Sequence, residues 1–75
     1  MGEHGTPRLT ADQVISILRR NGFLLAGTSG SHQKWRNSAN DKQVIVAYHR
    51  GRVLPLGTMK AIIEGSGIDL SKWTR

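Results

Sequence analysis

The chain has 75 residues, which is room for one domain with a modest hydrophobic core, and its lack of cysteine excludes disulfides and thiolate metal sites. Eleven Lys and Arg against five Asp and Glu give a formal net charge of +6, which attracts polyanions, most commonly nucleic acid. No apolar run approaches the ~20 residues that span a bilayer and no signal-peptide pattern opens the chain, so we expect a cytoplasmic protein with no membrane partner.

The first predicted secondary structure is a helix that begins after a polar N-terminal tail. Residues 1–8 are predicted to be flexible, and residues 9–75 to form a single domain. Thr10 and Gln13 have the spacing of a capping box. An apolar stripe at helical spacing follows: Val14, Ile15, Ile17 and Leu18. Gly22 suits the left-handed conformation that ends a helix.

Three strands are predicted after this helix, because the sequence period changes from about 3.6 to 2. The strands cover residues 23–29, 31–37 and 42–49. Gly30 and the turn residues 38–41 separate them. Since these connections are too short for parallel crossovers, they favour an antiparallel meander.

A second helix is predicted after the third strand. Helix-start signals precede it without deciding which residue caps: Pro55, Gly57 and Thr58. Its apolar face has residues at i, i+3, i+6 and i+7: Leu56, Met59, Ile62 and Ile63. Residues 65–67 close this helix. A last short turn is then expected, in which Asp69 or Ser71 caps and Trp73 folds back onto the core.

The predicted order α-β-β-β-α places the chain in the α+β class. We expect a three-stranded antiparallel sheet with both helices on one face, which leaves the other face open to solvent or a ligand. Trp35 favours burial against the helices. Strand alternation then turns three polar side chains of the second strand to the open face: His32, Lys34 and Arg36.

A second histidine is expected on the same open face. The third strand has a better inward set, which is Val44, Val46 and Tyr48. If Trp35 packs beside this set, His49 points outward and comes opposite or diagonal to His32. Further basic residues follow the third strand or lie in the second helix: Arg50, Arg52 and Lys60.

Two imidazoles beside cations suit RNA cleavage that uses no metal ion. The reaction removes a proton from the 2′-hydroxyl and donates one to the leaving oxygen, and imidazole suits both transfers because its unperturbed pKa is about 6.5. We therefore predict His32 and His49 as catalytic residues. The predicted phosphate-binding residues are Lys34, Arg36, Arg50, Arg52 and Lys60. No metal or cofactor is expected, because the two histidines lack a third ligand and no phosphate-binding loop is present.

These residues also have plainer interpretations. A lone exposed histidine is more often ordinary surface, and the arginines can be solvated charge. The aromatic residues Trp35, Tyr48 and Trp73 suit core packing better than base stacking. One alternative function is a module that binds double-stranded RNA by its shape and does not cleave it. A third alternative is a protein-interaction domain whose basic face binds an acidic partner.

Three motifs in this order resemble the HicA family of toxins, also described as YcfA-like, over roughly residues 9–68. They are residues 18–23 (LRRNGF), residues 30–32 (GSH) followed by Trp35, and residues 56–68 (LGTMKAIIEGSGI). The resemblance implies a fold similar to a double-stranded-RNA-binding domain, mRNA cleavage without a metal ion and neutralisation by a HicB-type antitoxin. It also implies a catalytic role for the histidine of the Gly-Ser-His motif, His32.

The chain departs from the family pattern at two places. Gln33 stands where many members carry a second histidine. Residues 47–49 (AYH) stand where many members have proline or histidine. The role predicted for His49 therefore depends on the strand register and not on the resemblance.

Overall fold

The first helix begins and ends where its capping signals predict. In the computed structural model, which describes residues 6–74, helix α1 spans Ala11–Arg20. The Gln13 amide donates to Thr10 Oγ1 at 3.3 Å, and the Thr10 amide donates to Gln13 Oε1 at 2.9 Å, which completes the predicted capping box. Gly22 follows with a φ of +90°, and a Cβ there would lie 3.2 Å from the side-chain nitrogen of Asn37. The positive φ therefore favours glycine at this position, and a Cβ would fit tightly against Asn37.

Three antiparallel strands follow in the order β1-β2-β3, as predicted, but each is shorter than predicted. They span Leu24–Ser29, His32–Asn37 and Lys42–Ala47. Phe23 lies outside β1 because its amide donates to the Leu18 carbonyl and closes the helix. At the far end, the Tyr48 amide still donates to the Ser31 carbonyl at 2.7 Å. The chain then leaves the ladder at His49.

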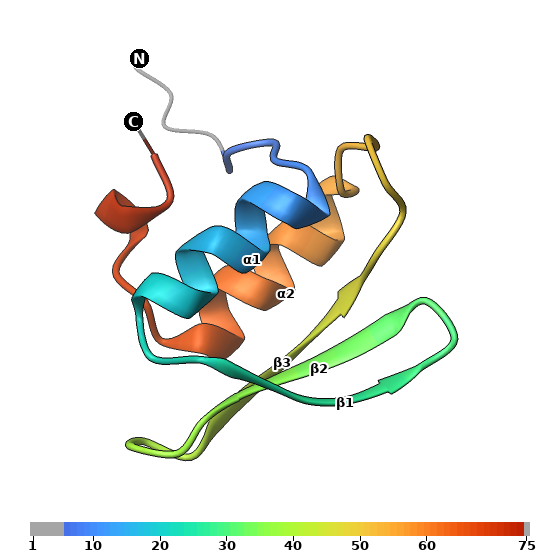
Figure 1. The fold of residues 1–75 in the computed structure, drawn as a ribbon. Coiled ribbons are helices and arrows are strands. Elements are labelled where there is room, and N and C mark those ends of the chain that lie inside the picture. Colours follow the sequence, from blue (N-terminus) through green and yellow to red (C-terminus); the bar gives the residue numbers. More distant parts are fainter. Residues whose placement is uncertain (1–5, 75) are drawn as a thin grey trace.

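Both helices cover the same face of the sheet (Figure 1). Helix α2 spans Leu56–Ser66, with Pro55 as its N-cap and Gly67 in the left-handed conformation after its last turn. A short 3₁₀ helix, η1, spans Leu70–Lys72, and Asp69 caps it by accepting from the Ser71 amide. Trp73 then folds back and is only 1% exposed, which confirms the predicted final turn.

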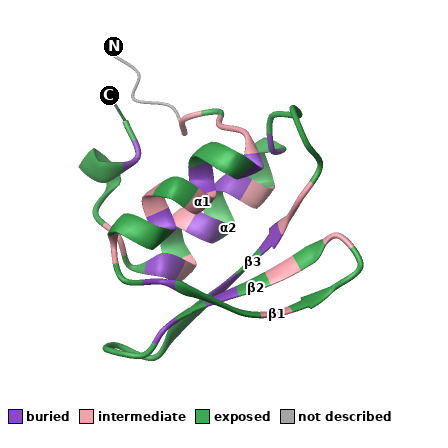
Figure 2. Cartoon of the chain, viewed as in Figure 1, coloured by how far each residue is buried: buried purple, intermediate pink, exposed green. Residues whose placement is uncertain are grey.

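The hydrophobic core lies between the helices and the sheet, where Figure 2 shows the buried positions on facing sides of the two layers. The sheet contributes Trp35, Val44 and Val46, and the helices contribute Val14, Leu18, Met59 and Ile62. One predicted core residue is wrong, because Leu56 is 46% exposed at the first position of α2. Leu54, two residues earlier, is buried instead, and its amide donates to the Leu9 carbonyl at 2.8 Å.

The N-terminal tail was predicted for residues 1–8, of which residues 1–5 lie outside the described range. Residues 6–8 belong to no helix or strand. None of the helices in residues 6–74 has the length and apolar character needed to cross a membrane.

Candidate functional site

The sheet surface that faces away from the helices carries a regular grid of side chains, which we call the outer face. Residues paired directly across antiparallel strands share a face, so the strand register defines three rows. These rows, from the β1–β2 turn inward, are Ser29, His32 and Ala47; Gly27, Lys34 and Ile45; and Leu24, Arg36 and Gln43. The central strand β2 therefore lines up one imidazole and two cations along the middle of the outer face.

The side chains of His32, Lys34 and Arg36 are all exposed, whereas Trp35 between them is 2% exposed and packs into the core. This confirms the predicted orientation of strand β2. The neighbours of His32 in its row are Ser29 and Ala47, which are small. A ligand can therefore approach the imidazole without displacing a bulky side chain.

The two cations of β2 differ in their surroundings. Arg36 forms an ion pair with Asp41, whose φ of +61° belongs to the turn between β2 and β3. Within residues 6–74, Lys34 has no carboxylate at ion-pair distance. Lys34 also lies one row from His32, whereas Arg36 lies two rows away. Lys34 is therefore the cation of β2 that is better placed to hold a phosphate beside the imidazole.

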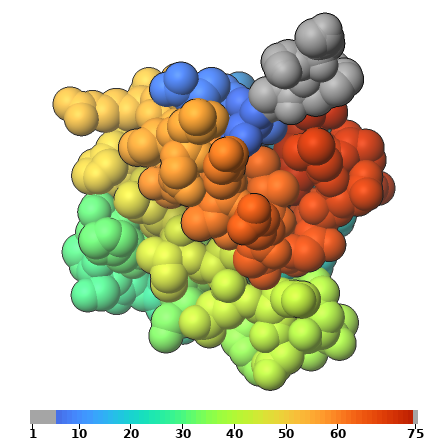
Figure 3. Space-filling model, turned by 180° about the vertical axis from the view of Figure 1, so that it is seen from behind, coloured from blue at the N-terminus to red at the C-terminus, as the bar shows by residue number. Residues whose placement is uncertain are grey.

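The second predicted histidine lies beyond the end of β3. The direct partner of His32 is Ala47, so His49 does not lie opposite His32, and the paired register ends at Ala47, two residues before His49. His49 is exposed, and its carbonyl accepts from the Arg52 amide at 3.1 Å, which closes a turn. Arg50 and Arg52 are exposed in this turn, which lies on the same side of the molecule as the β1–β2 turn (Figures 1 and 3).

Lys60 is not brought to the outer face. It is exposed on α2, in the helical layer on the other side of the sheet. Among the predicted site residues, the structure thus gathers His32, Lys34 and Arg36 on one strand and places His49, Arg50 and Arg52 at the adjoining end of the sheet.

A small hollow on the outer face adds residues that the sequence pattern did not reveal. It has a volume of about 220 Å³, and its lining residues are Gly27, Thr28, Ser29, His32, Lys34 and Ile45. A shift in register between Leu25 and Gly27 brings Gly27 opposite Lys34. Because this bulge breaks the alternation of β1, period-two patterning alone does not assign Gly27 to this face.

A family model described as "HicA toxin of bacterial toxin-antitoxin" matches residues 11–68, from the start of α1 to just after α2. This match covers well over half of the chain. The chain belongs to the HicA toxin family. No curated protein matches it. HicA toxins pair with HicB antitoxins in general, and toxins of the family are generally ribonucleases.

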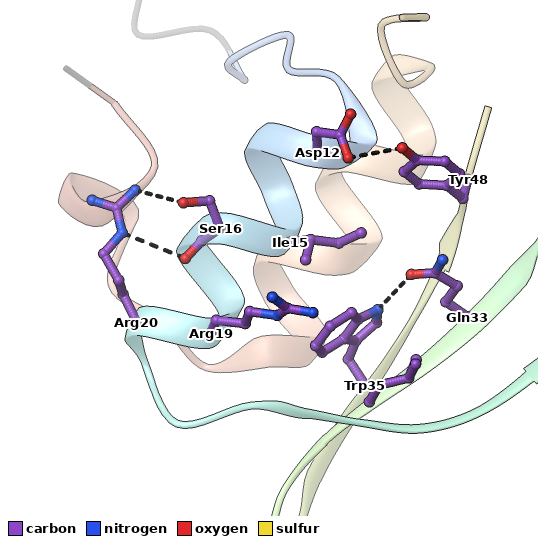
Figure 4. Close-up of a pocket in the computed structure, with 9 residues that line it drawn as sticks. Asp12, Ile15, Ser16, Arg19, Arg20, Gln33, Trp35 and Tyr48 are labelled. Carbon is purple, nitrogen blue, oxygen red and sulfur yellow. Dashed lines mark hydrogen bonds between the residues drawn. The ribbon is translucent and has the colours of Figure 1, made fainter. Parts of the chain in front are cut away.

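A second groove of this HicA chain lies between α1 and the sheet, with a volume of about 590 Å³ (Figure 4). Its polar groups bind one another. The Tyr48 hydroxyl donates to Asp12 at 2.9 Å, and the Trp35 indole nitrogen donates to Gln33 at 3.1 Å. The hydrogen bond to the Asp12 carboxylate raises the pKa of Tyr48 above its usual value. The Arg19 guanidinium lies 5.2 Å from the Trp35 ring centroid.

Two of these contacts, Tyr48 with Asp12 and Arg19 with Trp35, connect α1 to the sheet and the residue that follows it. Gln33, which stands where many HicA members have a second histidine, faces the helices and lies away from His32. Trp35 and Tyr48 likewise contact α1 residues, which agrees with their plainer interpretation as packing residues.

In the part of the chain that the structure describes, no three His, Asp or Glu side chains lie close enough together to hold a metal ion.

Proposed function

We propose that this HicA toxin cleaves mRNA without a metal ion and that His32 is its catalytic residue. The observation that carries this proposal is the position of His32: exposed on the middle strand, between small neighbours, one row from Lys34. The family supports a ribonuclease, since HicA toxins are generally ribonucleases. His32 is also the histidine of the Gly-Ser-His motif.

The proposed reaction is transfer within the RNA backbone. A base removes the proton from a ribose 2′-hydroxyl, and the 2′-oxygen attacks the adjacent phosphorus. The bond from phosphorus to the 5′-oxygen breaks as an acid protonates that oxygen. The products are a 2′,3′-cyclic phosphate and a 5′-hydroxyl. Imidazole serves either proton transfer near neutral pH. His32 performs one of them, and His49, two residues beyond the strand partner of His32, is the proposed partner for the other.

Cations around His32 fit the charge that develops on the phosphate oxygens. Lys34 is the proposed first contact, because it lies nearest His32 in the grid and forms no ion pair within residues 6–74. Arg36 contributes when a phosphate competes with Asp41 for its guanidinium. Arg50 and Arg52 extend the phosphate track along the end of the sheet. Lys60 on α2 is proposed to contact a more distant part of the RNA.

The proposed protein partner is a HicB-type antitoxin, and the proposed location is the cytoplasm, where mRNA is found. The formal net charge of +6 favours an antitoxin surface rich in carboxylates. Binding over the outer face would also exclude RNA.

The reaction is tested by incubating the purified protein with a long single-stranded RNA in EDTA and identifying the ends of the fragments. We expect cleavage that leaves cyclic phosphate or 3′-phosphate ends. A second substrate with one 2′-deoxynucleotide at the cleaved position should resist cleavage there, because it lacks the attacking oxygen.

Two outcomes would contradict the proposal. Cleavage that stops in EDTA and returns with a divalent cation would assign the chemistry to a metal ion. RNA that is bound but left intact would support a binding module on the same fold, with affinity that falls steeply with salt.

A further inference from the structure

The hollow on the outer face is small and has charged, polar and apolar residues in its lining. Its volume is about 220 Å³, below the range of about 300 to 1,000 Å³ that is typical of sites for drug-sized ligands. It therefore accommodates a single planar ring system and little more. His32 and Lys34 line the same hollow, so a ring held there lies beside the proposed catalytic group.

The walls of the hollow include a glycine, Gly27, which has no side chain, and an apolar residue, Ile45. Gly27 leaves open space, because a Cβ added there would meet no atom within 4 Å. Ile45 lies two strands away in the same row and is 45% exposed. An aliphatic side chain exposed among cations offers a surface for the face of a base, while Lys34 between the two residues can hold the phosphate.

The bulge in β1 creates this arrangement. With regular pairing beyond Leu25 and Trp35, the residue opposite Lys34 would be Ala26. The register shift places Gly27 opposite Lys34 instead. The row next to His32 therefore has open space where Ala26 would have placed a methyl group. Bulges next to functional sites commonly redirect side chains in this way.

We propose that the hollow formed by Gly27, Lys34 and Ile45 binds one unpaired nucleobase adjacent to the phosphodiester that His32 cleaves. This inference rests on the proposed ribonuclease function and specifies its substrate as single-stranded RNA. A base in a duplex is stacked and paired, and so it cannot enter the hollow.

The test uses a single-stranded oligoribonucleotide that the protein cleaves at one position. Two further versions carry an abasic ribonucleotide on one or the other side of the cleaved bond. One abasic version should be cleaved about 5- to 150-fold more slowly than the intact RNA, the range expected for loss of one base contact. Annealing the intact RNA to its complement should prevent cleavage.

The Gly27→Val variant fills the hollow with a branched side chain that suits a strand. The φ of Gly27 is not in the left-handed region, so valine is sterically allowed there. We expect this variant to cleave intact RNA more slowly than the wild type does, by a factor similar to that of the abasic RNA. It should cleave intact and abasic RNA at equal rates. Ala26→Val is the matched control, because Ala26 is exposed on the same strand outside the hollow, and it should behave as the wild type.

Circular dichroism establishes whether Gly27→Val is folded. If it is not, Ile45→Ala provides the second variant, since it removes the apolar wall from an exposed position, and it should reduce the discrimination against the abasic RNA. Equal cleavage of all three single-stranded RNAs by the wild type, or equal cleavage of the duplex, would overturn the inference while leaving the ribonuclease function intact.

Two further outcomes distinguish failure of the proposed base site from failure of the proposed ribonuclease function. If no RNA is cleaved, the proposed function fails, and equal affinity for intact and abasic RNA would then overturn the base site as well. If Gly27→Val cleaves RNA normally but escapes inhibition by the antitoxin, the hollow binds a protein side chain and the assignment to a base is wrong.

Discussion

Replacement of Trp73 by alanine is expected to destabilise the fold severely, although this residue lies beyond the region matched by the family model. The Trp73 side chain is 1% exposed. A buried tryptophan removes about 150 to 250 Å² from water, which at about 25 cal/mol per Å² corresponds to about 4 to 6 kcal/mol. Measured costs of such truncations are about 3 to 5 kcal/mol. A domain of this length has a stability of roughly 4 to 11 kcal/mol, so the loss is a large fraction of the total.

Thermal unfolding followed by circular dichroism measures this effect. A loss of 3 kcal/mol or more corresponds to a decrease in Tm of at least about 12 °C for a domain of this size. Trp73→Phe is the control variant for Trp73→Ala, and it should lose less stability. The indole nitrogen has no hydrogen-bond partner within the described residues, and burying such a group costs about 1 to 3 kcal/mol, which offsets part of the lost packing. A Trp73→Ala protein within about 1 kcal/mol of the wild type would refute the assignment of η1 and Trp73 to the core.

Three further variants test individual contacts. Thr10→Ala removes the N-cap of α1 and should lower the free energy of unfolding by about 1 kcal/mol in a denaturant titration, whereas an unchanged midpoint would contradict the cap. The raised pKa of Tyr48 means that its hydrogen bond to Asp12 stabilises the fold below the usual tyrosine pKa of about 10, and that this stability is lost as pH rises through the raised value. The stability difference between wild type and Tyr48→Phe should therefore shrink above about pH 10, and a constant difference up to strongly alkaline pH would oppose this reasoning. Asp41→Asn removes a negative charge and frees Arg36 from its ion pair, so RNA affinity should rise and its dependence on log salt should steepen by about 0.7 to 1, measured by titrations at several salt concentrations; an unchanged slope would mean that Arg36 does not contact phosphate.

Much of the fold follows from local signals in the sequence. The capping box at Thr10 and the glycine at position 22 bound α1, and the alternation around Trp35 separates the core face from the outer face. These features are predictable because each depends on neighbours a few residues away. Strand ends were less predictable. The Phe23 amide donates to the Leu18 carbonyl of α1 and so stays outside β1, and β3 ends at Ala47 although the Tyr48 amide still donates to the Ser31 carbonyl.

The outer face was predictable only in part. The orientation of His32 follows from alternation within one strand, but the exact partner of His32 depends on pairing between strands, which made Ala47 and not His49 the opposite residue. The position of Gly27 depends on a bulge that no periodic pattern contains. The pairing of Arg36 with Asp41 depends likewise on the conformation of a turn.

The central claim is that His32 performs the chemistry on an otherwise intact RNA-binding face. The most direct test is the single-turnover rate of RNA cleavage in EDTA by wild type and by His32→Ala, after circular dichroism has shown that both are folded. His32 is exposed, so its truncation should leave the stability within about 0.5 kcal/mol of the wild type. We expect His32→Ala to lose cleavage by at least about 100-fold and to retain its RNA affinity. A folded His32→Ala protein that cleaves RNA at the wild-type rate would contradict the central claim.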